Sequence, residues 1–128
     1  MDNREFEIFK YLFRWQKGKQ QSGYVKMLLA ALMWPFKLDM YLLRFPTGSA
    51  IAFHTDKVLS GRHFRLNIVI KEAKKGGHFC CDTPLFETKR IKLFRPDLNE
   101  HAGTRIDSGC HYVFSIGWLR SEHKDSND

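Results

Sequence analysis

Two histidines and one aspartate carry the clearest chemistry in this chain. His54 and Asp56 are separated by a single residue, and His101 follows them later in the sequence. Side chains alternate between the two faces of an extended strand, so His54 and Asp56 point to the same side. A neighbouring antiparallel strand can then bring in His101. Two imidazoles and one carboxylate leave part of a metal's coordination sphere open, which suits Fe(II), whereas a structural zinc has a closed shell rich in Cys.

The stretch that contains these residues has the pattern of short β-strands separated by turns. Alternating apolar residues between turn signals indicate an antiparallel sandwich or barrel, with helices packed on one side. The predicted strands are Leu38–Phe45, Ser49–Thr55, His63–Lys71, Gly77–Cys81, Lys89–Arg95 and His111–Arg120.

The N-terminal region is predicted to supply these helices. Three phenylalanines recur at helical spacing between Glu5 and Trp15, at positions Phe6, Phe9 and Phe13, and this spacing is typical of a short amphipathic helix. The apolar stretch from Tyr24 to Met33 fits either a second helix or a buried strand.

Length and composition indicate one folded domain. The chain has 128 residues with 43% hydrophobic residues, enough for a single core. Its longest apolar run, Met27 to Phe36, is too short to span a bilayer. The N-terminus lacks the pattern of a signal peptide. The three cysteines, Cys80, Cys81 and Cys110, do not form a disulfide framework, so we expect a cytoplasmic protein and no membrane.

The net charge of +7 leaves two interpretations open. Lysines on solvated faces would keep the protein soluble, whereas clustered lysines would attract a polyanion such as a nucleic acid. The basic residues sit in turns or alternate with apolar residues, as on half-exposed strands. His63 and His123 are expected at the surface.

From Leu38 to Trp118 the order of motifs resembles the 2-oxoglutarate and Fe(II)-dependent oxygenases, especially the prolyl-hydroxylase-like branch. In that branch an HxD strand precedes an Arg-containing strand, a Gly-Gly turn, an apolar strand, a distal His and a basic residue about ten positions later. The matching segments here are His54-Thr-Asp56, Arg65-Leu-Asn-Ile-Val-Ile70, Gly76-Gly77-His-Phe79, Ile91-Lys-Leu-Phe94-Arg-Pro-Asp97, His101 and Gly109-Cys-His111-Tyr-Val-Phe-Ser115-Ile-Gly-Trp118.

The resemblance implies a mainly β fold, a double-stranded β-helix or cupin-like jelly roll. It would divide the single domain, 1–128, into an N-terminal helical support (1–36), the jelly-roll core (38–120) and a disordered tail (121–128). His54, Asp56 and His101 would hold the iron and form the catalytic centre.

The resemblance also implies a clamp for the distal carboxylate of 2-oxoglutarate. Ser115 occupies the family's Ser or Thr position, but His111 stands where the family has Arg or Lys. An imidazole is titratable and cannot form a bidentate fork, although a neighbouring carboxylate would raise its pKa. Arg44 and Arg65 are therefore alternative partners if they face the pocket.

The implied activity is a dioxygenase reaction with Fe(II), 2-oxoglutarate and O2. A C–H bond of a primary substrate would be hydroxylated while 2-oxoglutarate is decarboxylated to succinate. A protein side chain is the favoured substrate and a nucleobase the second; the oligomeric state is not predicted. The alternative is a metal-binding pseudoenzyme or interaction module with impaired 2-oxoglutarate binding. A cupin-like zinc or nickel hydrolase or isomerase also stays open.

Overall fold

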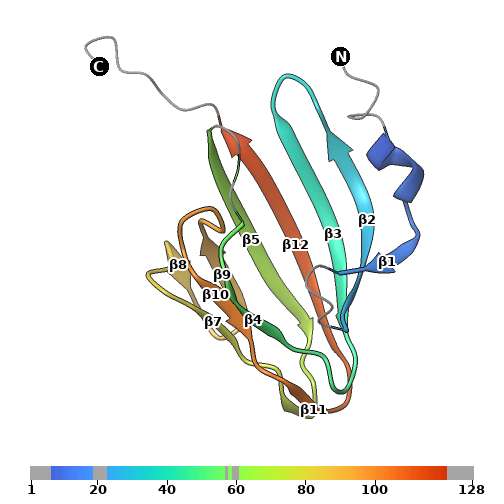
Figure 1. Ribbon diagram of the computed structural model, residues 1–128, viewed down its shortest axis with the longest axis vertical. Coiled ribbons are helices and arrows are strands. Elements are labelled where there is room, and N and C mark those ends of the chain that lie inside the picture. Colours follow the sequence, from blue (N-terminus) through green and yellow to red (C-terminus); the bar gives the residue numbers. More distant parts are fainter. Residues whose placement is uncertain (1–6, 19–22, 57, 59–60, 121–128) are drawn as a thin grey trace.

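The computed structural model of the protein describes residues 7–18, 23–56, 58 and 61–120. In this part of the chain the regular structure consists of antiparallel β-strands and one short 3-10 helix, η1 (Glu7–Tyr11), as Figure 1 shows. None of these residues belongs to a helix long and apolar enough to cross a membrane.

The larger of the sheets has seven strands and forms one wall of the molecule. Its order is β1-β2-β3-β12-β5-β9-β8, so the first long strands and the last strand of the chain lie side by side. The strands are β1 (Trp15–Lys17), β2 (Val25–Leu32), β3 (Lys37–Phe45), β12 (His111–Arg120), β5 (Arg62–Lys71), β9 (Ile91–Phe94) and β8 (Phe86–Glu87).

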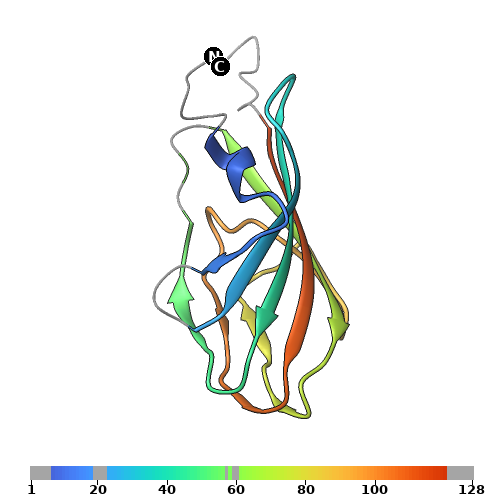
Figure 2. The same cartoon turned by 90° about the vertical axis from the view of Figure 1, so that its right-hand side faces the viewer.

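A smaller sheet of three strands forms the second layer, in the order β4-β10-β7. These strands are β4 (Ile51–His54), β10 (His101–Gly103) and β7 (Phe79–Cys81), and β11 (Ile106–Ser108) pairs separately with β6 (Lys75–Gly76). The view turned by 90° shows β4 and the large sheet on opposite sides of the molecule (Figure 2). After β3 the chain passes repeatedly from one antiparallel sheet to the other, from β3 to β4 to β5 and from β9 to β10 and back to β12, which is the arrangement of a jelly roll.

Strand β12 shows how the sequence pattern builds the inner surface. It pairs with β3 on one side and β5 on the other, so its backbone hydrogen bonds are made in both directions. His111, Val113, Ser115 and Gly117 alternate with less buried residues. Two of these four inward positions are polar, so β12 lines a site as well as a core.

The predicted strands are confirmed in position, with small changes at their ends. β12 (His111–Arg120) has the predicted bounds, and β3 and β5 each begin one residue earlier than predicted. Strands β1, β6, β8, β10 and β11 were not predicted, because strands of two or three residues are too short to show a periodicity.

The predicted N-terminal helices are wrong for the described residues. η1 (Glu7–Tyr11) is a single 3-10 turn, and Leu12 already bridges to Leu28 of β2. Val25–Leu32, which the sequence left open between helix and strand, is β2 and pairs along its length with β3. Pairing with the sheet overrides the weak local helical preference. The predicted tail at 121–128, like Phe6 and His123, lies outside the described residues.

The core residue Phe94 gives a test of this packing. Its side chain is 1% exposed and contacts the rings of Phe79 and His101. Phe94→Ala should lower the free energy of unfolding by about 3–5 kcal/mol, as expected when a buried ring leaves a cavity. Urea denaturation measures this loss. Phe86→Ala on neighbouring β8, where the ring is 53% exposed, should cost far less, and equal losses would contradict the assigned core.

Candidate metal centre

His54 and His101 are brought together by the pairing of β4 with β10. They are direct partners in the antiparallel register, and their ring centroids lie 4.3 Å apart. The register shifts within this pair, since Gly103 pairs with Ile51. Such a bulge bends a strand and re-aims its side chains. Here both imidazoles end on one side of the small sheet.

Asp56 completes the group from just beyond the end of β4. Its backbone N–H donates to the carbonyl of Pro96 at 2.6 Å, which ties it to the segment leading into His101. Its Oδ1 lies 3.5 Å from Nε2 of His54 and its Oδ2 lies 3.4 Å from Nε2 of His101. The three ligand atoms lie within 4.8 Å of one another. The predicted triad therefore assembles.

Backbone carbonyls determine which nitrogen each histidine can offer. Nδ1 of His54 lies 2.8 Å from the carbonyl of Ala52, and Nδ1 of His101 lies 2.9 Å from the carbonyl of Asn99. A carbonyl only accepts, so each Nδ1 carries its proton and each neutral ring has its lone pair on Nε2. This outer hydrogen bond is typical of metal-binding histidines. The donor set fits a divalent cation.

Asn99 is a positioning residue that the sequence did not reveal. Its side-chain Oδ1 accepts the N–H of Arg95 at 2.9 Å, and its own N–H donates to the carbonyl of Arg95 at 2.7 Å. These bonds form a compact turn whose carbonyl then holds His101. The only signal in the sequence is an Asn two residues before the ligand, which also fits an ordinary turn.

The triad faces a central cavity between the two sheets, with a volume of about 900 Å³. Phe79 of β7 and Phe94 of β9 pack against His101, with ring centroids 6.1 and 5.0 Å from its own. The wall opposite the small sheet comes from the inner faces of β3, β5, β9 and β12. This enclosure lowers the local dielectric, and charges inside it interact more strongly than in water.

A polar network lies on that opposite wall, centred on Arg65. Its Nη1 donates to Oγ of Ser115 at 2.7 Å and its Nη2 donates to Oδ1 of Asp39 at 2.6 Å. Ser115 in turn donates to Oδ1 of Asn67 at 2.6 Å. Arg65 and Ser115, both named from the sequence, therefore meet in the cavity.

Gly117 makes room for the Arg65 side chain. A Cβ built on Gly117 would lie 2.0 Å from Nη2 and 2.4 Å from Cζ of Arg65. These distances are too short for any real contact, so the guanidinium crosses β12 only because this residue has no side chain.

His111 also lines the cavity, but in a neutral state. Burial lowers the pKa of His111, and its Nδ1 accepts the N–H of Ala73 at 3.2 Å, so that nitrogen holds no proton. The sequence had suggested a raised pKa beside a carboxylate. That expectation concerned the carboxylate of the co-substrate and stays a prediction; among the protein's own residues, burial outweighs the raising effect of Glu72 on the pKa, because His111 is 8% exposed.

Arg44 does not reach the cavity. It is exposed on the opposite face of β3 from Tyr41 and Leu43, which line the cavity, and its Nε lies 3.3 Å from Sγ of Cys110. Alternation along the strand explains this placement, since residues an odd number of positions apart face opposite sides. Of the seven predicted site residues, the other six line the cavity.

Within the described residues, no second group of His, Cys, Asp or Glu is placed to bind a metal. Burial, reinforced by nearby Asp82 and Glu87, raises the pKa of the Cys81 thiol to about 11. That thiol stays protonated at neutral pH and is a poor ligand.

Comparison with known proteins identifies the fold. No protein-family model matches the chain, and no curated protein matches it. KdgF from a Halomonas species has 17% identity and a TM-score of 0.55, covering 83% of this chain and 87% of its own. The cupin domain of Schizosaccharomyces pombe Cnp3 has 10% identity and a TM-score of 0.59, covering 84% and 69%.

A predicted oxalate decarboxylase from Thermotoga maritima has 12% identity and a TM-score of 0.51, covering 76% of this chain and 81% of its own. Likeness at such low identity shows the fold alone, which is the double-stranded β-helix of the cupins. It does not single out the oxygenases, so that finer assignment belongs with the proposals below.

The triad predicts that the protein binds one divalent metal. His54→Ala, Asp56→Ala and His101→Ala should each abolish tight binding, because each removes one of three protein ligands. Metal content after dialysis against Mn(II) or Fe(II), with circular dichroism to check folding, measures the effect. His78→Ala, which changes another cavity-lining histidine, should keep its metal. Unchanged metal content in all three triad variants would refute the site.

His63, expected at the surface, instead lies on the inner face of β5, and this placement predicts a pH effect on stability. Burial, with a smaller contribution from Arg65, lowers the pKa of His63 to about 4, from 6.5. Between pH 4 and 6.5, His63 therefore binds a proton more readily in the unfolded chain than in the folded protein. The contribution of His63 to stability is therefore present above pH 6.5 and lost as the pH falls toward 4.

Chemical denaturation between pH 4 and 7 checks this effect. The free energy of unfolding should fall less steeply with acidity in His63→Phe than in the wild-type protein. Equal slopes in the two proteins would show that His63 does not titrate as its burial indicates.

Proposed function

We propose that this cupin-fold protein is a non-haem Fe(II) oxygenase that uses 2-oxoglutarate as co-substrate. The observation that carries the proposal is the grouping of two Nε2 atoms and one carboxylate, within 4.8 Å of one another, at the cavity between the two sheets. Two histidines and one carboxylate with open positions are typical of such oxygenases. When bound, Fe(II), 2-oxoglutarate and O2 supply the hydroxylation of a C–H bond, with release of succinate and CO2.

The residues of this chain would hold and orient those groups. His54, Asp56 and His101 would bind the metal, and the carbonyls of Ala52 and Asn99 keep the two rings turned toward it. Phe79 and Phe94 exclude water from the side of His101. The protein's contribution is therefore a fixed ligand set in a shielded space.

Arg65 is the best partner for the distal carboxylate of 2-oxoglutarate. It is permanently charged and lies on the cavity wall beside Ser115, the residue that the oxygenase resemblance assigns to the same carboxylate. Its bonds to Ser115 and Asp39 use two of the five N–H donors of a guanidinium, so donors remain for a ligand. His111 is a weaker partner, because its pKa is lowered and a neutral imidazole supplies no charge.

The primary substrate in this proposal is a protein side chain, with a modified nucleobase as second choice. The net charge of +7 favours an acidic partner of either kind. Lys74, Lys75 and Lys89 lie along the lining of the cavity, where they would attract negative charge.

A metal-binding module without catalysis is the second candidate, and one observation favours it. Oδ1 of Asp39 lies 2.6 Å from Nη2 of Arg65 and forms an ion pair with it. The carboxylate of an incoming ligand must therefore compete with the carboxylate of Asp39. Conversion of 2-oxoglutarate to succinate by the Fe(II)-loaded protein, without primary substrate, separates the two functions. Turnover excludes the module, whereas confirmed metal binding without turnover favours it.

Arg65→Ala should weaken the affinity for N-oxalylglycine, an inert analogue of 2-oxoglutarate, by roughly 10- to 150-fold. This range corresponds to the loss of a charge-assisted hydrogen bond, about 1.5–3 kcal/mol. Calorimetric titration of the Mn(II)-loaded protein measures it. His111→Ala should change the affinity little, and the affinity should vary little between pH 6 and 8. If His111→Ala abolished N-oxalylglycine binding and Arg65→Ala had no effect, His111 and not Arg65 would be the partner of the carboxylate.

Gly117→Ala should weaken N-oxalylglycine binding through Arg65, because the new methyl group would displace the guanidinium. In an Arg65→Ala background the same change should add almost nothing, since the displaced group is absent. Gly103→Ala is the control: Gly103 lines the cavity, and a Cβ there would meet nothing closer than 3.9 Å. If Arg65→Ala and Gly117→Ala reduced the binding free energy of N-oxalylglycine additively, Gly117 would not act through Arg65.

A further inference from the structure

The tip of the hairpin between β2 and β3 is an apolar projection at one end of the large sheet. Leu32, Trp34 and Phe36 are exposed there, and Trp34, at 75%, is the most exposed large apolar side chain among the described residues. Single apolar side chains on a surface are ordinary, whereas a contiguous group of them marks a contact site. Figure 1 shows the hairpin reaching beyond the neighbouring ends of β5 and β12. The tip is convex, so it would insert into a partner and not receive one.

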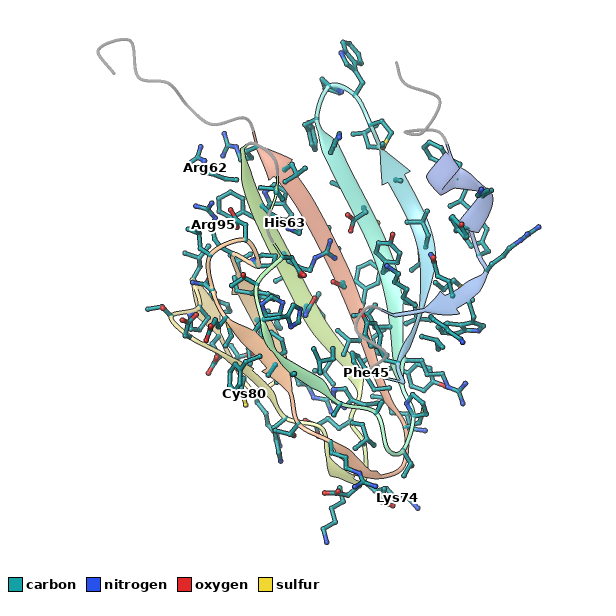
Figure 3. The ribbon with its side chains drawn as sticks, viewed as in Figure 1. Phe45, Arg62, His63, Lys74, Cys80 and Arg95 are labelled. Atoms are coloured by element: carbon teal, nitrogen blue, oxygen red, sulfur yellow. The ribbon has the colours of Figure 1, made fainter. Side chains whose placement is uncertain are left out.

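Basic residues lie at the same end of the large sheet. Arg120 at the end of β12 pairs with Arg62 at the start of β5, and Lys37 at the start of β3 lies on the other side of β12. Figure 3 shows Arg62 at the end of the molecule toward which the hairpin projects, and Lys74 at the opposite end. The apolar tip therefore has a positively charged border.

The four strands that meet at this end carry almost no negative charge. No acidic residue occurs in β2, β5 or β12, and the single one in β3, Asp39, is bonded to Arg65 at the cavity. The complementary surface must therefore be negative at its outside and apolar beneath. A bilayer of anionic lipids has this order of layers, since its charged headgroups cover its hydrocarbon.

A second copy of the chain is a poorer occupant of this surface. In a symmetric dimer through the hairpin tip, the basic border of one copy would lie close to that of the other, and like charges repel. Aromatic side chains are, in contrast, enriched where a bilayer meets water. Stable attachment to a membrane surface usually needs two contributions, such as apolar insertion and a basic patch, and this end of the sheet offers both.

We propose that the tip of this hairpin docks on an anionic membrane surface, with Trp34 and Phe36 inserted at the level of the headgroups. Lys37, Arg62 and Arg120 then lie close to the negative charges of the lipids. The sequence led us to expect no membrane, because no apolar run is long enough to span a bilayer. Contact of a hairpin tip with one surface requires no such run. This docking is independent of the proposed function.

Vesicles of phosphatidylserine and phosphatidylcholine in equal parts are the probe, and vesicles of phosphatidylcholine alone are the uncharged reference. In co-sedimentation, the full chain should bind the anionic vesicles more tightly than the neutral ones, and added salt should weaken that binding. Trp34→Ser should weaken it by on the order of tenfold, because the largest inserted group is lost. Phe86→Ser is the control: Phe86 is also exposed, but on β8 at the edge of the large sheet, so the affinity should stay within about twofold.

Arg120→Glu tests the basic border. It changes the charge by two, and at about fivefold in affinity for each charge near an anionic surface it should weaken binding by roughly 25-fold. Arg44→Glu is the matched control, because it makes the same change at another exposed arginine. Arg44 pairs with Tyr112 near the opposite end of β12, roughly 26 Å along the strand. Salt screens a charge at that distance, so the affinity should change by no more than about twofold.

Trp34→Phe tests insertion separately from attraction. It keeps an aromatic ring at the tip, so the variant should still bind the vesicles, but the quenching of tryptophan fluorescence by brominated lipid should be lost. Undiminished quenching in this variant would show that Trp15 or Trp118, the other two tryptophans of the chain, meets the lipid, and would overturn the assigned tip.

Two further results would overturn the docking surface. The first is wild-type protein that does not bind the anionic vesicles, or binds them no better than Trp34→Ser does. The second is wild-type protein that self-associates without lipid while Trp34→Ser stays monomeric, which would make a second copy of the chain the occupant. Metal content should be unchanged in Trp34→Ser, so either result would leave the candidate metal centre and the proposed function standing.

Discussion

The whole candidate site depends on the antiparallel register that sets His54 opposite His101. Strand register fixes which side chains meet, since a slip of one residue turns every side chain to the other face. The bond from the Asp56 N–H to the Pro96 carbonyl extends that register beyond the end of β4. The position of all three candidate metal ligands therefore follows from this one pairing.

The protein divides its two sheets between two tasks. The small sheet supplies the candidate metal ligands His54 and His101 from β4 and β10, and Asp56 follows the end of β4. The large sheet supplies charge and hydrogen bonds from the inner faces of β3, β5 and β12. Neither sheet forms the site alone, so the spacing of the layers is part of the chemistry, as in other sites held on rigid elements.

The triad and the β-rich core could be predicted because they follow local rules. His54 and Asp56 lie together as predicted, although Asp56 follows the end of β4 and is held by the carbonyl of Pro96. In β12 the predicted alternation is seen directly, because every second residue from His111 to Gly117 is buried. The strand conformation of Val25–Leu32 could not be predicted, because its pairing with β3 decides between helix and strand. The sequence alone could not distinguish Arg44 from Arg65 as the cation of the cavity. In the structure, the orientation of each strand places Arg65 in the cavity and Arg44 on the outer face. The low pKa of His63 depends on neighbours far away in sequence.

The ion pair between Arg65 and Asp39 acts as a selectivity threshold. A free arginine in a cavity would attract any small anion, including the abundant inorganic ones. Here an anion gains little unless it replaces or shares the carboxylate that the guanidinium already holds at 2.6 Å. Only a ligand with further attachment points elsewhere in the cavity can offset that exchange, because specificity is a difference between competing affinities. In the proposed function, the pair would thereby disfavour weakly bound anions relative to a ligand that is anchored at both ends.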